Sequence, residues 1–306
     1  MQPSPIQEIK SDLLQRKKVK LFLKRDDLIH PSVSGNKWRK LKYNLAAAKE
    51  LNHSTLLTFG GAFSNHIHAV AAAGKAFDFR TIGIIRGERI EPLNATLKYA
   101  EDQGMQLHFV TRSTYRQKDT DQFHLALQEQ FGQFYSLPEG GTNTLALKGC
   151  AEIVTEIKDQ LVYTPTYIAS CCGTGGTIAG IIKGVATTEQ TEILGVSALK
   201  GNFLTKEVDN LLATAKVVTA TKWSISNDYH FGGYAKFKPA LIEFINDFKK
   251  THQIALDPIY TGKLLYGIFD LLKKDYFKKD STIVAIHTGG LQGINGFNQR
   301  YGKLIA

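Results

Sequence analysis

Ser-Cys-Cys-Gly-Thr-Gly-Gly-Thr, residues 170–177, is the stretch around which the fold is organised. The residues before it, 166–170, are apolar and rich in β-formers, and residues 178–185 after it are apolar without proline, which predicts a strand and then a helix. A strand, a glycine-rich turn and a helix start form an anion site, because the first helical amides lack intrahelical partners and the helix dipole favours negative charge.

The glycines of this stretch let the backbone approach a phosphate, and Thr174 and Thr177 can add hydroxyl donors. From this stretch alone, a turn that binds nothing is an equally weighted alternative. The pattern is not a Walker loop, because no lysine follows the glycines, and it is not G-x-G-x-x-G after a first strand. A phosphate bound here would therefore belong to something other than a typical nucleotide.

The composition is that of a globular protein, with 43% hydrophobic and 22% charged residues. The length of 306 residues is enough for one large domain or two ordinary ones. No apolar run approaches the roughly 20 residues that span a bilayer, and residues 1–5 lack an apolar signal core. We therefore expect a cytoplasmic protein without a membrane partner.

The net charge of +10 raises the alternative of nucleic-acid binding. The basic residues are spread along the chain, however, and no aromatic–glycine RNA motif or helix-turn-helix pattern is present. The charge therefore favours anionic small molecules or solubility, and we expect no nucleic-acid partner.

Cysteines and histidines give no sign of a disulfide framework or a metal site. Cys150, Cys171 and Cys172 are odd in number, and two are adjacent, which indicates reduced thiols in a reducing compartment. There is no C-x-x-C pair, and His66 and His68 diverge on a helix because they are two residues apart. We expect no metal.

Predicted strands and helices alternate along the chain, which indicates an α/β fold with a parallel sheet. Loops at the carboxyl ends of parallel strands bind ligands, and those loops contain Ser64, residues 173–177 and Thr288. The predicted strands are 19–24, 54–59, 79–85, 105–110, 133–135, 166–170, 192–198 and 282–287. The predicted helices are 37–50, 65–77, 94–103, 121–130, 143–161, 178–185, 204–215, 238–252 and one opening in 257–263, while 223–234 is predicted to be a loop.

Lys37 lies at the start of a predicted helix, with Asn36 as the expected N-cap. A positive charge meets the unfavourable end of the dipole there, a violation of local preference that functional positions often show. The alternative, a lysine reaching into solvent, is the one that charge patterning alone favours.

A phosphate cradle, a helix-initiating lysine and a second glycine loop with Thr288 suggest pyridoxal phosphate. Residues 34–41, Ser-Gly-Asn-Lys-Trp-Arg-Lys-Leu, resemble the lysine signature of the fold type II pyridoxal-phosphate enzymes. The resemblance is to the group that holds 1-aminocyclopropane-1-carboxylate deaminase and D-cysteine desulfhydrase. It extends in order over nearly the whole chain, through residues 25–28, 64–66, 173–177, 233–234, 257–263 and 287–290.

This resemblance implies a tryptophan synthase β-like architecture of two woven three-layer α/β/α domains with mostly parallel sheets. Residues 1–42 and 146–306 would form the large cofactor-binding domain, and residues 43–145 a small inserted domain. It also implies a homodimer that acts on a small amino acid, with pyridoxal 5'-phosphate as cofactor.

The resemblance also implies roles for individual residues. Lys37 would bind the cofactor covalently and later return protons to the substrate. Asn65 would hydrogen-bond its phenolic oxygen, and its phosphate would be held by Gly173, Thr174, Gly175, Gly176 and Thr177.

Ser64, with backbone donors around Asn65 and His66, would bind the substrate carboxylate. Tyr260 would lie against the cofactor ring, and Tyr234 would face the substrate. The alternatives are that Ser64 is only an N-cap and that the two tyrosines are ordinary aromatic core.

Two departures from the deaminase pattern bear on the reaction: Thr261 stands where the deaminase has an acid, and Thr288 where it has leucine. A threonine hydroxyl is a neutral partner for the pyridine nitrogen and does not strengthen the electron sink as a carboxylate does. β-Elimination from a cysteine-like substrate needs a weaker sink than opening a cyclopropane.

The threonine pair therefore favours a D-cysteine desulfhydrase, which forms pyruvate, sulfide and ammonia. The alternative is a 1-aminocyclopropane-1-carboxylate deaminase, which forms 2-oxobutyrate and ammonia. A non-catalytic or nucleic-acid-binding protein that kept the fold is an alternative of another class. His68 stands where relatives often carry arginine, which affects the expected substrate contacts.

Overall fold

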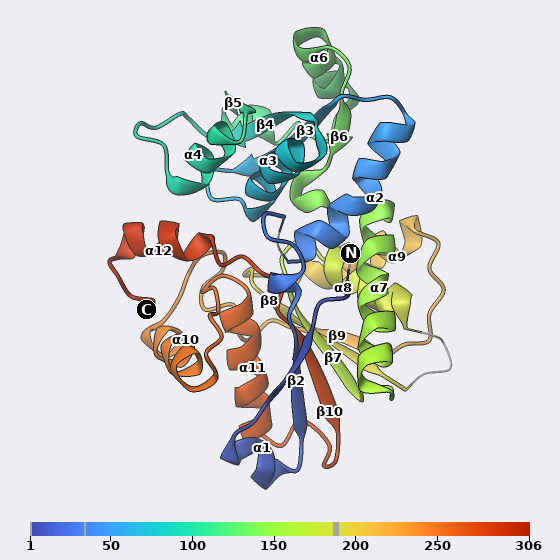
Figure 1. Cartoon of the computed structure of the whole chain (residues 1–306), viewed down its shortest axis with the longest axis vertical. Helices are drawn as coiled ribbons and strands as arrows, with labels where there is room; N and C mark the ends of the chain where they lie inside the picture. Colours follow the sequence, from blue (N-terminus) through green and yellow to red (C-terminus); the bar gives the residue numbers. More distant parts are fainter. Residues whose placement is uncertain (1, 34, 186–189) are drawn as a thin grey trace.

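The structure is a computed structural model that describes residues 2–33, 35–185 and 190–306, so that Ser34 of the lysine motif lies outside the described residues. Within them the chain forms two β-sheets, a six-stranded sheet in the lower part of Figure 1 and a four-stranded sheet in the upper part. The predicted α/β class is confirmed.

The six-stranded sheet has the order β1-β2-β10-β7-β8-β9. All its pairs are parallel except β1 with β2. Its strands are β1 Ile6–Ile9, β2 Lys20–Lys24, β7 Tyr167–Cys172, β8 Glu192–Ser197, β9 Trp223–Ser226 and β10 Thr282–Ile286. The prediction that residues 223–234 form only a loop is wrong at its start, because β9 is a four-residue strand that is only partly buried and carries little hydrophobic signal. β1 was not predicted either.

The four-stranded sheet is wholly parallel, with the order β5-β4-β3-β6. Its strands are β3 Thr55–Gly61, β4 Arg80–Arg86, β5 Met105–Val110 and β6 Tyr135–Leu137. They come from residues within the predicted small domain, and the strands of the larger sheet come from outside it. The predicted domain boundaries themselves stay a prediction.

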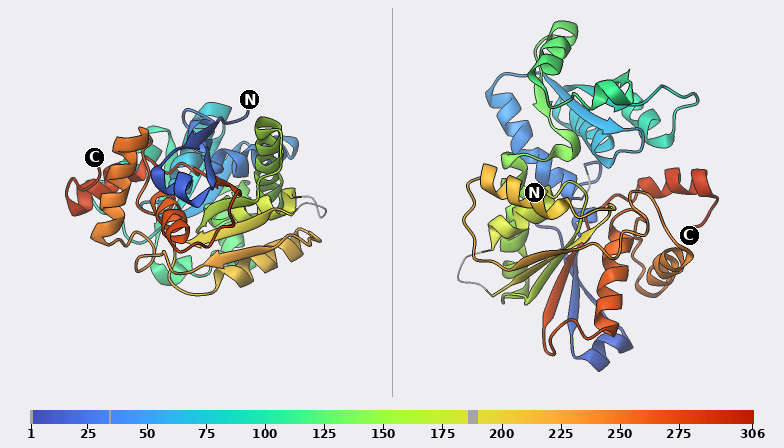
Figure 2. Two further views of the ribbon diagram at one scale, coloured as in Figure 1. Left: turned by 90° about the horizontal axis from the view of Figure 1, so that it is seen from below. Right: turned by 180° about the vertical axis from the view of Figure 1, so that it is seen from behind.

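Helices cover both faces of each sheet. They are α1 Asp12–Lys17, α2 Asn36–Glu50, α3 Asn65–Phe77, α4 Ala95–Asp102, α5 Arg112–Tyr115, α6 Asp121–Phe131, α7 Thr144–Leu161, α8 Gly176–Gly184, α9 Leu204–Thr214, α10 Pro239–His252, α11 Thr261–Lys273 and α12 Gly293–Tyr301. Two 3-10 turns lie at Asp26–Leu28 and Glu139–Gly141. Figure 2 shows α10 and α11 on one side of the large sheet and α7 to α9 on the other.

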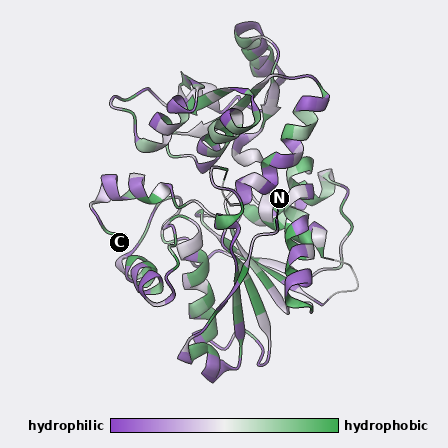
Figure 3. Cartoon of the chain, viewed as in Figure 1, coloured by the Kyte–Doolittle hydropathy of each residue, from purple (hydrophilic) through white to green (hydrophobic). Residues whose placement is uncertain are grey.

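The side chains of strand β7 show why helices cover both faces of the large sheet. Successive side chains of a strand point to opposite faces. Tyr167, Ala169 and Cys171 join the core beneath α10 and α11, and Ile168 and Cys172 join the core beneath α7 and α8. Every residue of β7 is buried, and Figure 3 shows the hydrophobic strands between amphipathic helices. Among the described residues no helix is long and apolar enough to cross a membrane.

The start of α2 differs from the prediction. Gly35 occupies the N-cap position with φ 67°, and Asn36 is the first helical residue. A Cβ on Gly35 would lie 2.0 Å from the Thr288 carbonyl oxygen, so the close approach of β10's loop requires glycine. The prediction of Asn36 as N-cap is therefore wrong, and its side chain is free for the contacts described below.

Candidate active site

A cavity of about 450 Å³ lies where the carboxyl ends of strands from both sheets meet. Loops after β3, β6, β7, β8 and β10 and the last residue of β4 all contribute to its wall, as expected of ligand sites in α/β folds. The cavity is lined by Asn36, Lys37, Lys40, Gly61, Ala62, Phe63, Ser64, Asn65, His66, Arg86, Glu139, Gly140, Cys171, Cys172, Gly173, Thr174, Gly175, Gly176, Thr177, Ile178, Leu199, Tyr234, Tyr260, Thr288 and Gly289.

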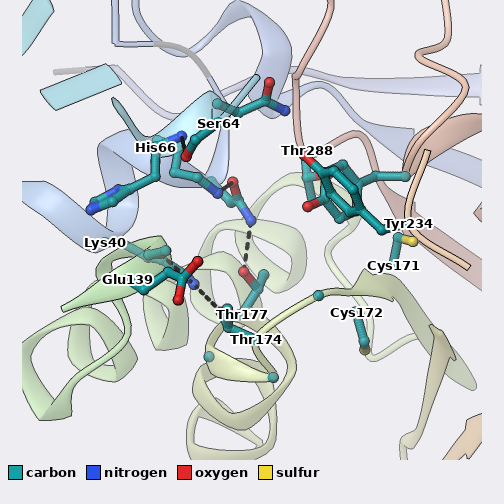
Figure 4. A pocket seen from close by; sticks show the side chains of 18 of the residues that line it. Lys40, Ser64, His66, Glu139, Cys171, Cys172, Thr174, Thr177, Tyr234 and Thr288 are labelled. Carbon is teal, nitrogen blue, oxygen red and sulfur yellow. Dashed lines mark hydrogen bonds between the residues drawn. The ribbon is translucent and has the colours of Figure 1, made fainter. Parts of the chain in front are cut away.

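The sequence-predicted site residues gather here with one exception. Figure 4 shows Ser64 and His66 on one side of the cavity, Thr174 and Thr177 on another, and Tyr234 and Thr288 on a third. Only Thr261 is not part of the lining. The roles predicted for these residues stay predictions, but their convergence from distant parts of the chain makes a single binding site.

The glycine-rich loop forms a cradle at the start of α8. A Cβ on Gly176 would lie 2.7 Å from the Thr142 side chain and 3.0 Å from Lys40 Nζ, and a Cβ on Gly173 would lie 3.1 Å from the Tyr260 ring. Side chains at these positions would fill the space above the amides of the helix start, which are the groups that bind an anion.

Lys40 supplies a buried positive charge beside the cradle. Its side chain is 2% exposed, and Nζ donates to Gly140 O at 3.1 Å, Thr142 Oγ1 at 2.9 Å and Thr174 Oγ1 at 3.3 Å. These acceptors are neutral, and burial lowers the lysine's pKa. A buried cation without a carboxylate partner is costly. A phosphate dianion at this loop would supply the missing charge, so the residues present fit pyridoxal phosphate.

Lys37 is held at the cavity wall by the residue that precedes it. Its Nζ donates to Asn36 Oδ1 at 3.1 Å, while Asn36 Nδ2 donates to Thr177 Oγ1 at 2.8 Å. Asn36 therefore links the lysine to the phosphate loop. Burial first, and then the nearby Lys40 charge, lower the pKa of Lys37 to about 7. A substantial fraction of the amine is then neutral and nucleophilic near neutral pH.

The depressed pKa of Lys37 predicts a pH effect on stability in protein freed of any ligand at this lysine. Between pH 7 and the ordinary pKa of 10.5, the folded chain binds fewer protons than the unfolded chain, so the free energy of unfolding rises with pH. From pH 7 to pH 9 we expect a gain of about 2 kcal/mol that Lys37→Met lacks. Urea unfolding of both proteins at the two pH values measures this, and equal pH dependence would contradict it.

Ser64 caps α3, as predicted, and also faces the cavity. Its Oγ accepts from the amides of His66 at 3.2 Å and Ile67 at 3.3 Å. Because Oγ is the acceptor in both bonds, the hydroxyl hydrogen remains available to a ligand. The N-cap reading and the binding role are therefore compatible.

His66 is 2% exposed and its Nδ1 has no hydrogen-bond partner among the described residues. Nε2 lies 2.8 Å from Thr58 Oγ1, whose hydroxyl donates to Leu137 O. The threonine must therefore accept from Nε2–H, which leaves Nδ1 as an unprotonated acceptor. Burial, and after it the charges of Lys37 and Lys40, hold the pKa of His66 well below its ordinary value.

Tyr234 and Tyr260 lie edge to face, with ring centroids 6.3 Å apart. Lys263, which is fully buried, holds the loop that carries Tyr234: its Nζ donates to His230 O at 2.8 Å, Gly233 O at 2.7 Å and Ala198 O at 3.2 Å. The start of α11 thus positions both tyrosines, one directly and one through Lys263.

Thr261 is committed to Asp257 rather than to the cavity. Its hydroxyl donates to Asp257 Oδ1 at 2.7 Å and accepts from Asp257 N at 2.9 Å. The Asp257 carboxylate, 1% exposed, also accepts from the amides of residues 259–261. Asp257 therefore fixes the turn that presents Tyr260. Of the pair Thr261 and Thr288, it is Thr288 that lines the cavity.

The sequence did not predict the contacts of Asn36 or a place in or beside the site for four further residues, namely Lys40, Asp257, Arg86 and Glu139. A signal existed for Lys40, because residues three apart on a helix share a face, and Lys37 was already a candidate. No local signal existed for Arg86, the last residue of β4, or for Glu139, which lies in the 3-10 turn after β6.

The cysteines carry no reactive thiol. Cys150, Cys171 and Cys172 are buried and free. Burial raises the pKa of Cys172 to about 12 and that of Cys171 well above its ordinary value, so their thiolates are scarce. Across the described ranges no cluster of three or more metal-ligating side chains occurs.

Comparison with known proteins gives one consistent family. The family described as "Pyridoxal-phosphate dependent enzyme" matches residues 2–289. A putative 1-aminocyclopropane-1-carboxylate deaminase of Thermotoga maritima is 30% identical over 98% of this chain and 97% of its own length. A bifunctional D-cysteine desulfhydrase/1-aminocyclopropane-1-carboxylate deaminase of Arabidopsis thaliana is 30% identical over 90% of this chain and 73% of its own.

Among solved structures, one described as an ACC deaminase homologue superposes with a TM-score of 0.86 at 28% identity, covering 100% of this chain and 94% of that one. A threonine deaminase isoform of Solanum lycopersicum has a TM-score of 0.68 at 18% identity, covering 98% of this chain and 83% of that one, and shares the fold.

Proposed function

We propose, starting from the fact that the chain belongs to the family of pyridoxal-phosphate dependent enzymes, that it degrades small amino acids as a D-cysteine desulfhydrase-like lyase. The products would be pyruvate, sulfide and ammonia. The observation that carries the proposal is the convergence of Lys37, the cradle of residues 173–177 and the uncharged Thr288 in one cavity.

When bound, pyridoxal phosphate supplies an electron sink for negative charge at the substrate's α-carbon. Its phosphate would be held by the loop 173–177 and by Lys40, and Lys37 would bind its aldehyde carbon. Tyr260 would pack against its ring, and Asn65 would contact its phenolic oxygen.

The remaining chemistry belongs to side chains of this protein. Ser64, through its free hydroxyl hydrogen, and the amides at the start of α3 would bind the substrate carboxylate, because helix N-termini favour anions. Lys37, whose pKa of about 7 suits proton transfer near neutral pH, would exchange the proton at the α-carbon. Tyr234 would limit the space for the leaving group.

Elimination from cysteine is supported over ring opening by the absence of a cavity-facing carboxylate at positions 261 and 288. Thr261 donates its hydroxyl hydrogen to Asp257, and Thr288 is uncharged. The second candidate, a 1-aminocyclopropane-1-carboxylate deaminase, is favoured by the names of several relatives, including the Thermotoga maritima protein.

Parallel assays with D-cysteine and 1-aminocyclopropane-1-carboxylate distinguish the two candidates. We expect pyruvate and sulfide in equal amounts from D-cysteine, and little 2-oxobutyrate from the cyclopropane substrate. Predominant 2-oxobutyrate would establish the deaminase instead. If cofactor-loaded protein forms neither product, the proposed substrate class is wrong.

We also propose a cytoplasmic homodimer without nucleic-acid or membrane partners. Three buried, unpaired cysteines support a reducing compartment. The dispersed basic residues support the absence of a nucleic-acid site. Light scattering of the purified protein tests the dimer, and strongly salt-dependent DNA binding would contradict the partner assignment.

A further inference from the structure

Two opposite charges stand at the wall of the cavity that belongs to the small sheet. Arg86 is the last residue of β4, and Glu139 follows β6 by two positions. Strand β3 runs between β4 and β6, so both side chains sit at the same carboxyl edge, on either side of the loop that carries Ser64. Both line the cavity.

Arg86 and Glu139 face one cavity without pairing. Arg86 is exposed, and among the described residues its guanidinium makes no ion pair or side-chain hydrogen bond; it lies over the Tyr115 ring at 5.4 Å. Among the described residues, the Glu139 carboxylate has a long ion pair, at 3.8 Å, with Lys118, which bonds Asp119 at 2.6 Å, and it also lies close to the Tyr115 hydroxyl. Each charge therefore keeps capacity for a ligand.

Tyr115 lies close to both charged side chains. Its side chain is 3% exposed, and its hydroxyl makes no hydrogen bond of ordinary geometry among the described residues, although the Glu139 carboxylate is the acceptor close to it. Burial and then the Glu139 carboxylate raise the pKa of Tyr115, and the Arg86 charge acts in the opposite direction. A guanidinium and a carboxylate thus both lie near Tyr115, and both line the cavity.

Cysteine and the cyclopropane amino acid leave this pair without a partner, because their side chains carry no group of complementary charge. The amino and carboxyl groups of a second amino-acid head would complement it: the carboxylate with Arg86 and the ammonium with Glu139. Arginine binds carboxylates in a fork geometry, and such charge-assisted bonds are the strong ones.

We propose that Arg86 and Glu139 form a subsite for the far end of a substrate whose β-substituent, attached through sulfur, ends in a second amino-acid head group. This inference rests on the proposed function, since it uses the same β-elimination. The substrate class is thus a thioether-bridged pair of amino acids rather than free cysteine.

The reaction balances with water as the only co-reactant. The α-proton is removed, its bonding electrons form the Cα–Cβ double bond, and the Cβ–S bond breaks with its electron pair on sulfur, which takes up a proton. The departing molecule is cysteine. The remaining 2-aminoacrylate takes up one water and loses ammonia to give pyruvate.

The test compares holoenzyme kinetics on meso-lanthionine and D-cysteine, with pyruvate as the common product. Meso-lanthionine contains both configurations of the α-carbon, so the result does not depend on stereochemical preference. We expect kcat/KM for lanthionine to equal or exceed that for D-cysteine. In Arg86→Gln and in Glu139→Gln, the kcat/KM for lanthionine divided by the kcat/KM for D-cysteine should fall at least tenfold. A tenfold fall is equivalent to about 1.4 kcal/mol.

Matched controls are Arg89→Gln and Glu129→Gln, which remove the same charges outside the cavity lining. They should leave the ratio unchanged. Turnover of D-cysteine with slow lanthionine cleavage, or an unchanged ratio in both cavity variants, overturns the inference and leaves the proposed function standing. Turnover of neither substrate by the holoenzyme overturns the proposed function and this inference with it.

Discussion

Lys37→Ala is expected to abolish turnover and to remove the near-visible absorbance of the bound cofactor. The variant loses the amine that would attach the cofactor and the group proposed to exchange the α-proton. Proton transfer by a positioned side chain alone contributes about 10²–10⁴-fold to rate, so the combined loss should exceed a thousandfold.

The fold should survive this change, because Lys37 has only Asn36 as a side-chain hydrogen-bond partner among the described residues. Unfolding curves and spectra of the variant, recorded with and without added pyridoxal phosphate, separate loss of attachment from loss of structure. A matched control is Lys49→Ala, at the other end of α2. Turnover in Lys37→Ala within tenfold of wild type would refute the assignment.

Arg39→Met is expected to give the largest loss of stability. Arg39 is 1% exposed and bonds both Asp26 and Glu156 in bidentate fashion, with distances of 2.7 and 2.8 Å in each case. Burial opposes its charge, but the two carboxylates outweigh burial and raise the pKa of Arg39. Lys24, fully buried, pairs with Glu156 at 2.7 Å and completes a neutral group of four charges.

Removing Arg39 leaves two carboxylates in the interior with one cation, which costs about 3–5 kcal/mol for a buried pair that loses one partner. Urea unfolding of wild type and variant measures the difference. Arg89→Met is the control, since its pairs with Glu91 and Glu101 are about 40–60% exposed, and such pairs contribute about 0–1 kcal/mol. A loss below about 1 kcal/mol in Arg39→Met would contradict the account.

The same variant should also weaken cofactor binding. Arg39 lies on α2 between Lys37 and Lys40, so the buried ion group fixes the helix turn that carries both lysines. Helix α7 supports this turn closely: a Cβ on Gly149 would lie 1.9 Å from the Arg39 carbonyl oxygen. Stability and site geometry therefore depend on one contact between α2 and α7.

Most elements were predictable from the sequence because their signals are local. Ser64 caps α3 through bonds to residues two and three positions away. The glycines of the cradle allow a turn between a buried strand and a helix start, and apolar periodicity marked the strands within one or two residues. Where local signals were weak, as in the half-exposed β9, the prediction failed.

Thr261 illustrates what local signals could not give. The resemblance to the deaminase pattern implied that Thr261 is a neutral group at the cofactor, but the folded turn directs its hydroxyl to Asp257, four residues earlier. Asn36 likewise was predicted to cap a helix. Its side-chain amide instead donates to Thr177, 141 residues away. The N-cap position is occupied by Gly35, where the Thr288 carbonyl oxygen leaves no space for a side chain.

By itself the sequence determined the α/β class, since glycines, caps and periodicity act within a few residues. The order of its motifs, through their resemblance to known enzymes, also indicated the pyridoxal-phosphate family. Only the tertiary structure decided which charges meet. Lys40 reaches Thr174 across 134 positions, and Arg86 and Glu139 share a cavity although Arg86 ends β4 and Glu139 lies in the 3-10 turn after β6. Such meetings depend on how whole elements pack, because the side chains that converge on a ligand come from the ends of separate strands.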